Sequence, residues 1–314
     1  MKRLICMLLA ALLLTLAGCG GEPAETTEAS TEPPAAAVRP TTAPTEESAP
    51  TDPPAQICPM AETVLVDDEN CTFAVLRASS NEYTGMELQV VCRNKTEKTL
   101  MFSWETVSVC GYMYDPVWSQ KVEPGETVES TVGIDTFLLE SYGILSVDEI
   151  SFCLTVIDNE NWMDAPLVSS RYEIFPTGKT AEAAVFPQRE SVKGEKVFLN
   201  DDLTFIIEYA ERTEQGDSLH CYVANATDKT VMFSWDSVEV DGCQLYPGWA
   251  VTVAPGKSAY SDIVFDRAAL GENGIGEGSR IEFTMIVSDY DDWSAGYLVD
   301  EVYTYTIEYG EPVG

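Results

Sequence analysis

The stretch KTLMFSWETVSVCG at residues 98–111 recurs as KTVMFSWDSVEVDG at residues 229–242. Around it, residues 94–162 align without a gap to residues 225–293, at a constant offset of 131 residues (225 − 94). The six Trp of the chain form matched pairs in this alignment: Trp104 with Trp235, Trp118 with Trp249, and Trp162 with Trp293. Because this period is far longer than a solenoid unit, it indicates a duplicated domain.

Each copy consists of short β-rich runs separated by turns. In the first copy these runs are TFAVLRA, MELQVVCRN, TLMFSW, TVSVCG, TVESTVGI, EISFCLTVID and SRYEIF, and the second copy has matching ones. Such runs, with turn signals between them, indicate an all-β protein with one β-sandwich per copy. One short helix is expected in each copy, with Asp135 or Asp266 as its N-cap and Gly143 or Gly274 at its end.

The alternation of apolar residues changes phase inside the opening stretch. Phe102 and Trp104 share one face of a strand, whereas Val107 and Val109 have the opposite parity. Since side chains alternate with a period of two, both pairs can face a core only if the strand is irregular between them. We therefore predict a β-bulge near residues 105–106 and at the matching place in the second copy, with the strand bending from one sheet to the other.

The first 19 residues have the features of a lipoprotein leader. MKR gives a positive start, LICMLLAALLLTL gives a short apolar run, and LAGC ends at Cys19. The LAGC segment resembles the lipobox of bacterial lipoproteins, which implies cleavage before Cys19 and a lipid on its sulfur. The predicted location is therefore extracytoplasmic, with the N-terminal lipid anchoring the chain to the bacterial cell membrane.

The rest of the chain divides by composition. Residues 20–60 are rich in Pro, Thr, Glu and Ala, so we predict a disordered tether there. The predicted repeats occupy residues 61–176 and 197–310, with residues 177–196 as the linker. With 52 acidic against 18 basic residues the net charge is −34, which excludes nucleic acid as an expected partner.

The order of short patterns in each copy is also informative. An N-x-T turn precedes a Phe/Trp strand, V-x-V-x-G, P-x-W, V-x-P-G, a short helix and I-x-F-x-x-x-V-x-D. This order resembles the immunoglobulin-like, telokin-like repeat of unknown function found in lipoproteins of Gram-positive bacteria. The resemblance implies two tandem immunoglobulin-like β-sandwiches, and it implies no catalytic residue. The N-x-T triplets at Asn70, Asn94 and Asn225 are interpreted as turns rather than glycosylation sites.

Catalytic chemistry has little support in the sequence. The chain has a single His, His220, in an apolar-rich strand, and none of the usual nucleophile or phosphate-binding motifs. Seven Cys follow Cys19, and none has a Cys partner in the other copy, so most are expected to be buried apolar residues. The alternative for Cys221 and Cys243 is a disulfide bridge within the second copy, because adjacent strands could bring them close enough. We predict that the protein is not an enzyme.

Two acidic loops are candidate calcium sites. The loops DNENW and DYDDW follow equivalent strands and place oxygen side chains at close spacing. The candidate ligands are Asp158, Glu160, Asn161, Asp289, Asp291 and Asp292. The alternative is a hairpin loop in which the first Asp caps the turn and the Trp packs back on the sandwich. Apart from calcium, no cofactor is expected.

Trp118 and Trp249 are the candidate ligand-binding residues, because each follows Pro in a loop and is expected to be partly exposed. Trp104 and Trp235 lie within apolar strands and are expected in the core. The predicted role is a non-catalytic one in adhesion, ligand capture or envelope structure, with an envelope protein or a glycan as partner. The alternatives are a carbohydrate-binding module that uses the loop Trp residues, and a hydrolase accessory or enzyme. The oligomeric state is left open.

Overall fold

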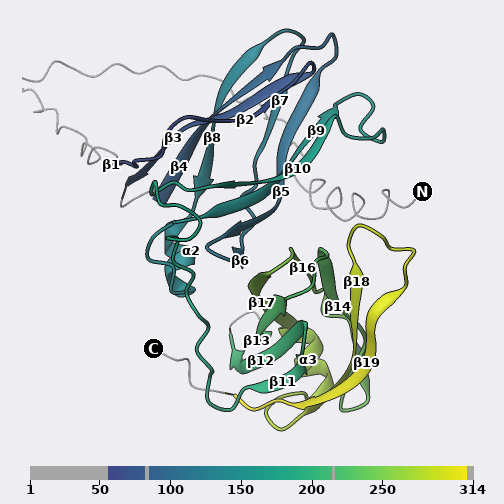
Figure 1. Ribbon diagram of the computed structural model, residues 1–314. Coiled ribbons are helices and arrows are strands. Elements are labelled where there is room, and N and C mark those ends of the chain that lie inside the picture. The colour runs from purple at the N-terminus through teal and green to yellow at the C-terminus, as the bar shows by residue number, and fades with distance from the viewer. Residues whose placement is uncertain (1–55, 82–84, 214–215, 310–314) are drawn as a thin grey trace, which may run out of the picture. The chain divides into compact units, whose positions relative to one another are not determined.

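The computed structural model of the chain describes residues 56–81, 85–213 and 216–309 (Figure 1). Strands dominate these residues, and nearly all of the strand pairings are antiparallel. The predicted all-β sandwich class is confirmed.

The first repeat is built from sheet A and one half of sheet B. Sheet A contains β1 (Gln56–Ile57), β3 (Cys71–Asn81), β4 (Gly85–Asn94) and β8 (Thr127–Ile134) in that order, with β2 (Thr63–Asp67) also paired to β3. The first half of sheet B contains β10 (Val168–Ile174), β9 (Ile150–Asp158), β5 (Leu100–Val109) and β6 (Tyr112–Met113), with β7 (Ser119–Val122) also paired to β5.

The second repeat uses the other half of sheet B and sheet C. That half of sheet B contains β17 (Lys257–Asp266), β13 (Gly216–Asn225), β12 (Leu203–Arg212) and β11 (Lys196–Asn200). Sheet C contains β15 (Cys243–Leu245), β14 (Val231–Val240), β18 (Arg280–Asp289) and β19 (Tyr297–Thr306), with β16 (Ala250–Val253) also paired to β14. Matching elements therefore occur in the same order in both repeats, as expected for a duplication.

Sheet B is continuous through both repeats, which the sequence did not predict. The join is a single parallel pair between Ser258 of β17 and Tyr112 of β6. The backbone N–H of Ser258 donates a hydrogen bond of 2.9 Å to the carbonyl of Gly111. Each repeat nevertheless has its own hydrophobic core, so the shared sheet links two separately packed sandwiches.

The same aromatic arrangement fills both cores. The Trp104 ring stacks on Phe152 with centroids 3.7 Å apart, and in the second repeat Trp235 stacks on Phe283 at 4.3 Å. Phe102 is fully buried and Trp104 nearly so, which confirms that both face the core. The repeated stretch therefore supplies the packing centre of each sandwich, where large aromatic surfaces stabilise the fold most.

The predicted bulge is confirmed, but the predicted change of sheet is wrong. The pairing of β5 with β9 shifts register between Glu105 and Ser108, and the pairing of β14 with β18 shifts at the matching place. Thr106 and Ser237 have φ values of 45° and 50°, in the left-handed region. Because β5 pairs with β9 on both sides of the bulge, the strand stays in sheet B throughout. The bulge instead restores the parity, so that Val107 faces the same core as Trp104.

The two helices match the predicted caps. Helix α2 (Thr136–Ser141) has Asp135 as its N-cap, and α3 (Arg267–Asn273) has Asp266. Gly143 and Gly274 follow the helices with positive φ values, as glycine at a helix end commonly does. In the residues that the structure describes, neither helix is long and apolar enough to cross a membrane.

Seven strands lie where none was predicted: β1, β2, β6, β7, β11, β15 and β16. β2 pairs with β3 at the start of the first repeat, and β11 pairs with β12 at the start of the second. β11 begins at Lys196, the last residue of the predicted linker. β1 lies within the predicted tether, where Ile57 pairs with Ser79. These strands were missed because they are short and bury few apolar side chains, which leaves no clear alternation to detect.

The buried Asn of the N-x-T turn holds together three parts of the first sandwich. The Asn94 side chain is fully buried, and its amide donates to the carbonyls of Lys98 at 2.6 Å and Val122 at 3.0 Å. Its carbonyl accepts from the N–H and hydroxyl of Thr96 at 2.9 and 2.8 Å. Asn225 makes the same contacts in the second repeat, which confirms the interpretation of both triplets as turns.

We predict that Asn94→Ala destabilises the protein by about 2–4 kcal/mol, because it leaves buried carbonyls without a donor. Urea denaturation followed by Trp fluorescence measures the loss. Asn70→Ala is the matched control, because this third N-x-T triplet lies at a less buried turn, and its expected effect is below about 1 kcal/mol. Equal effects of the two substitutions would contradict the structural role of Asn94.

Candidate functional site

The repeats meet at a cluster of tyrosines. The ring of Tyr260 from β17 lies parallel to Tyr112 of β6, with centroids 5.5 Å apart, and Tyr142 after α2 is 5.0 Å from the same ring. Burial raises the pKa of all three hydroxyls. These three rings supply part of the apolar contact between the repeats.

A buried ion pair accompanies the tyrosines. Lys257 Nζ of the second repeat lies 2.9 Å from Glu149 Oε1 of the first, and both side chains are largely buried. Lys257 also lies 5.9 Å from the ring centroid of Phe186, in the segment that joins the repeats. Since a buried charge without its partner is costly, this pair favours one relative position of the two repeats.

The joining segment is held at both of its ends. Near its start the buried carboxylate of Asp148 accepts hydrogen bonds from Lys179 Nζ at 2.6 Å and from the N–H of Val185 at 3.0 Å. Burial alone would raise the pKa of Asp148, but these bonds lower it. Towards its end Arg189 pairs with Glu208 at 2.8 Å and with Glu195. The segment predicted as a linker is therefore part of the interface.

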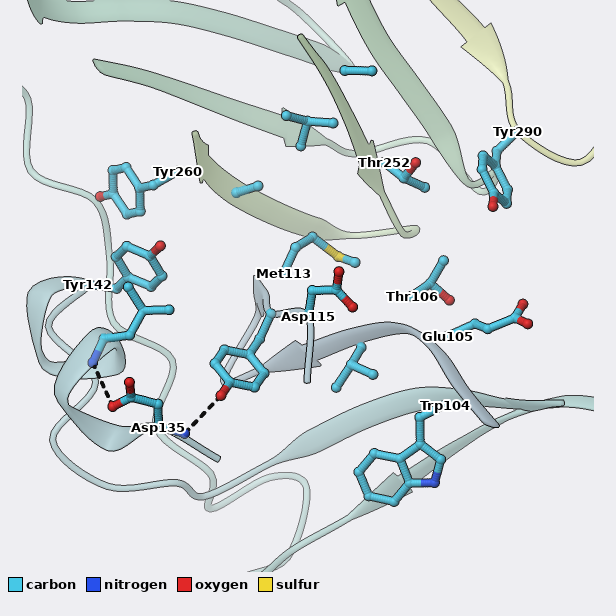
Figure 2. Close-up of a pocket in the computed structure, with 16 residues that line it drawn as sticks. Trp104, Glu105, Thr106, Met113, Asp115, Asp135, Tyr142, Thr252, Tyr260 and Tyr290 are labelled. Atoms are coloured by element: carbon cyan, nitrogen blue, oxygen red, sulfur yellow. Dashed lines mark hydrogen bonds between the residues drawn. The ribbon is translucent and has the colours of Figure 1, made fainter. Parts of the chain in front are cut away.

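A groove of about 700 Å³ lies beside this junction, with walls from both repeats (Figure 2). Asp115, Thr106 and Glu105 come from the first repeat. Tyr290 and Thr252 lie across the open space from them, and the stacked rings of Tyr142 and Tyr260 border the other end, as Figure 2 shows. Because each repeat supplies one wall, the groove exists only where two repeats are joined.

Two carboxylates of the groove are in no ion pair of the described residues. Glu105 and Asp115 are exposed and take part in no ion pair with any described residue. Asp135 differs, because its carboxylate accepts from the N–H of Phe137 at 2.9 Å as the cap of α2. A concave wall with two such carboxylates focuses negative potential. The groove therefore offers a cation carboxylate oxygens at one end and aromatic faces at the other.

The predicted ligand residues Trp118 and Trp249 lie outside this groove. Both are half-buried and pack on the cores, Trp118 against Trp104 with centroids 5.8 Å apart. Their Nε1 atoms donate to Ser130 Oγ at 3.2 Å and Ser261 Oγ at 2.9 Å. Each Trp thus already contacts the core with its ring and a strand hydroxyl with its donor.

The acidic loops have the geometry of capped turns. Asp158 Oδ1 accepts from the N–H of Glu160 at 3.0 Å, while Oδ2 accepts from Lys98 Nζ at 2.8 Å and from Asn161 Nδ2 at 2.8 Å. These bonds, first among them that of Lys98, hold the pKa of Asp158 well below its usual range.

The second loop repeats this scheme, with Asp289 accepting from Lys229 Nζ at 2.7 Å and from the N–H groups of Asp291 and Asp292. Among the described residues, no three His, Cys, Asp or Glu side chains are grouped to hold a metal ion. The geometry favours the turn over the calcium site in both loops.

The second loop differs from the first in its aromatic residues. Trp162 is more buried than its counterpart Trp293, which is 47% exposed. Tyr297, four residues after Trp293, is 63% exposed. The sequence comparison could have singled out Tyr290 and Tyr297, because the first repeat has Asn159 and Pro166 at their positions. Which side chains are exposed is visible only in the structure.

The Cys and His residues that the structure describes do not line the groove. All seven described Cys are free, so Cys221 and Cys243 are not bridged, and burial raises the pKa of Cys221 well above its ordinary value. His220 is on β13, stacked on Tyr209 with centroids 4.3 Å apart. The predicted lipidation site Cys19 lies outside the described residues.

No protein-family model matches the sequence, and no curated protein gives a significant match to it.

We expect His220 to make the free energy of unfolding depend on pH near neutrality. Its Nδ1 lies 2.7 Å from Asp262 Oδ1 and its Nε2 lies 3.2 Å from Glu211 Oε2. The hydrogen bond to Asp262 raises the pKa of His220, although burial opposes this. Protonated His220 therefore stabilises the folded state fully below about pH 6.5, the pKa of His in the unfolded chain. This stabilisation is lost as the pH rises through the higher pKa of His220 in the folded protein.

We predict that denaturant midpoints of the wild-type protein fall across this window, and that His220→Gln removes this part of the dependence. The test is a series of urea unfolding curves between pH 5.5 and pH 8.5. Because His220 is the only His of the chain, a dependence that persists unchanged in the variant would refute the assignment.

Proposed function

We propose that this protein is a non-catalytic ligand-capturing protein, with the groove between its two sandwiches as the binding site. The observation behind the proposal is the groove itself. It has two exposed carboxylates, Glu105 and Asp115, opposite Tyr290 and Thr252. Its volume of about 700 Å³ is within the range of small-molecule sites. The single His of the chain lies on another strand with its own carboxylate partners, which supports binding rather than acid–base catalysis.

The cellular setting is part of the same proposal. A positive start, an apolar run and LAGC before Cys19 support a lipid anchor outside the cytoplasm, and the following Pro/Thr/Glu/Ala-rich segment supports a tether. The resemblance to repeats in lipoproteins of Gram-positive bacteria agrees with this setting. A tethered module would sample ligand at the membrane surface while its negative charge keeps it away from anionic lipid.

The ligand proposed for the groove is an organic cation. Carboxylates bind ammonium groups through charge-assisted hydrogen bonds, and tyrosine faces attract cations. Methylene groups of such a ligand would pack on Met113 and Val251, which also line the groove. A linear alkylamine with several ammonium groups meets both requirements.

The glycan alternative has less support. As predicted, it requires Trp118 and Trp249 as exposed platforms, whereas both are half-buried with their donors engaged. Adhesion and an envelope structural role remain compatible with the sandwich fold. The groove favours ligand capture among the three because it combines a concave shape with carboxylates that have no described ion-pair partner.

The test is calorimetric titration of the two-repeat protein with spermidine. We expect binding that weakens with added salt, and we expect Asp115→Asn or Glu105→Gln to weaken it by about fivefold, since each removes one exposed charge contact. Asp236→Asn is the matched control. Asp236 occupies the position of Glu105 in the second repeat but does not line the groove, so its substitution should leave affinity unchanged.

No heat of binding, or equal weakening by the control, would contradict the proposed function. Binding of 1,8-octanediol, a neutral chain of similar length, with equal affinity would also contradict it, because recognition would then not depend on the ammonium charge.

A further inference from the structure

The outermost strand of sheet C, β19, is an open edge. It is ten residues long and pairs with β18 along Tyr297–Thr306, and no described strand pairs with its other side. The backbone N–H and C=O groups on that side are therefore available to another strand. Figure 1 shows β19 at the margin of the second repeat, in yellow.

This edge carries exposed apolar side chains as well as two exposed carboxylates, Asp300 and Glu301. Tyr297 is 63% and Val302 is 64% exposed, and Leu298 and the neighbouring Trp293 are also exposed. Soluble proteins commonly protect long edge strands with charges, proline or covering segments, because such strands otherwise pair with other chains. Exposed apolar side chains along a free edge of this length favour an interaction surface.

The first repeat shows that the sandwich does not need this surface. Its edge strand β10 has seven residues, and Pro166 and Arg171 occupy the positions of Tyr297 and Val302. Arg171 extends back over the bulge of β5, where its guanidinium donates to the hydroxyl of Thr106 at 2.9 Å. Because the same fold is built with proline and a paired arginine, the exposed Tyr297 and Val302 are particular to the second repeat.

The charges on β19 favour a basic partner strand over a second copy of this chain. Asp300 and Glu301 lie near the middle of the strand and are exposed. If two copies of this chain paired edge to edge about the strand centre, these four carboxylates would lie close together, and like charges in cross-strand positions are destabilising. A strand with Lys or Arg at those positions would place opposite charges there instead.

We propose that β19 binds an extended, basic segment of another polypeptide by strand addition. Backbone hydrogen bonds to the free edge supply affinity, as in other cases of β-augmentation. Lysine or arginine beside Asp300 and Glu301 sets the register, and β-branched residues pack beside Tyr297 and Val302. This surface is separate from the groove and does not depend on the proposed function.

The experiment uses the two-repeat protein and three blocked peptides, KVTVKVTVK, EVTVEVTVE and KVTPKVTPK. Backbone amide shifts in NMR spectra report binding, and amide hydrogen exchange reports its position. We expect the lysine peptide to bind and to slow exchange within Tyr297–Thr306. The glutamate peptide should not bind because of repulsion, and the proline peptide should not bind because it lacks the donors that a ladder requires.

Charge reversal tests the register. Asp300→Lys should reduce affinity for the lysine peptide at least tenfold and allow the glutamate peptide to bind. Val302→Arg gives β19 the residue that the first repeat has at this position. It should weaken binding of the lysine peptide as well. Glu173→Lys reverses an exposed charge on β10 of the first repeat and should change neither affinity.

Three outcomes would overturn the proposal. The first is equal binding of the lysine peptide to wild-type protein and Asp300→Lys. The second is protection from exchange outside β19. The third is wild-type dimerisation through this edge, seen by analytical ultracentrifugation and abolished by Val302→Arg. Asp115→Asn separates the two sites, because it should weaken spermidine and leave the lysine peptide unaffected.

Discussion

Both sandwiches depend on one backbone irregularity, the bulge that follows Trp104 in β5 and Trp235 in β14. Side chains on a strand alternate between faces, so a regular strand with this sequence would turn Val107 away from the core that Trp104 faces. The bulge places Thr106 and Ser237 in the left-handed region, a conformation that costs free energy for residues with a Cβ. The burial of apolar side chains on both sides of the bulge offsets this cost.

The duplication separates what the fold requires from what is particular to each repeat. The stacked Trp and Phe, the buried Asn of the turn, the helix N-cap and the ion pair between Lys98 and Asp158 all recur in the second repeat. These features pack the sandwich and close its loops. Asp115, Tyr290 and Val302 are replaced by other residue types at the matching positions of the other repeat. They lie in the groove or on the free edge. Candidate functions therefore come from the differences between the copies.

The junction between the repeats creates the groove. A single parallel strand pair, three stacked tyrosines and the ion pair of Lys257 with Glu149 join the sandwiches. The joining segment adds buried ion pairs around Asp148 and Arg189. Such a contact holds two walls at a defined separation, which a flexible linker would not do. Glu105 and Asp115 make one of these walls acidic.

The sequence by itself determined the duplication, the aromatic cores, the bulge and the helix caps. These follow from local constraints, because alternation records which face of a strand is buried and a capping residue acts within one turn. Only the tertiary structure decided that β5 stays in one sheet, that Trp118 packs inward while Trp293 is exposed, and that sheet B runs through both repeats. The groove is also visible only in the tertiary structure, because its walls come from residues more than a hundred positions apart in the sequence. Periodicity shows that a face is buried but not which segment covers it, and the pairing of distant segments decides that.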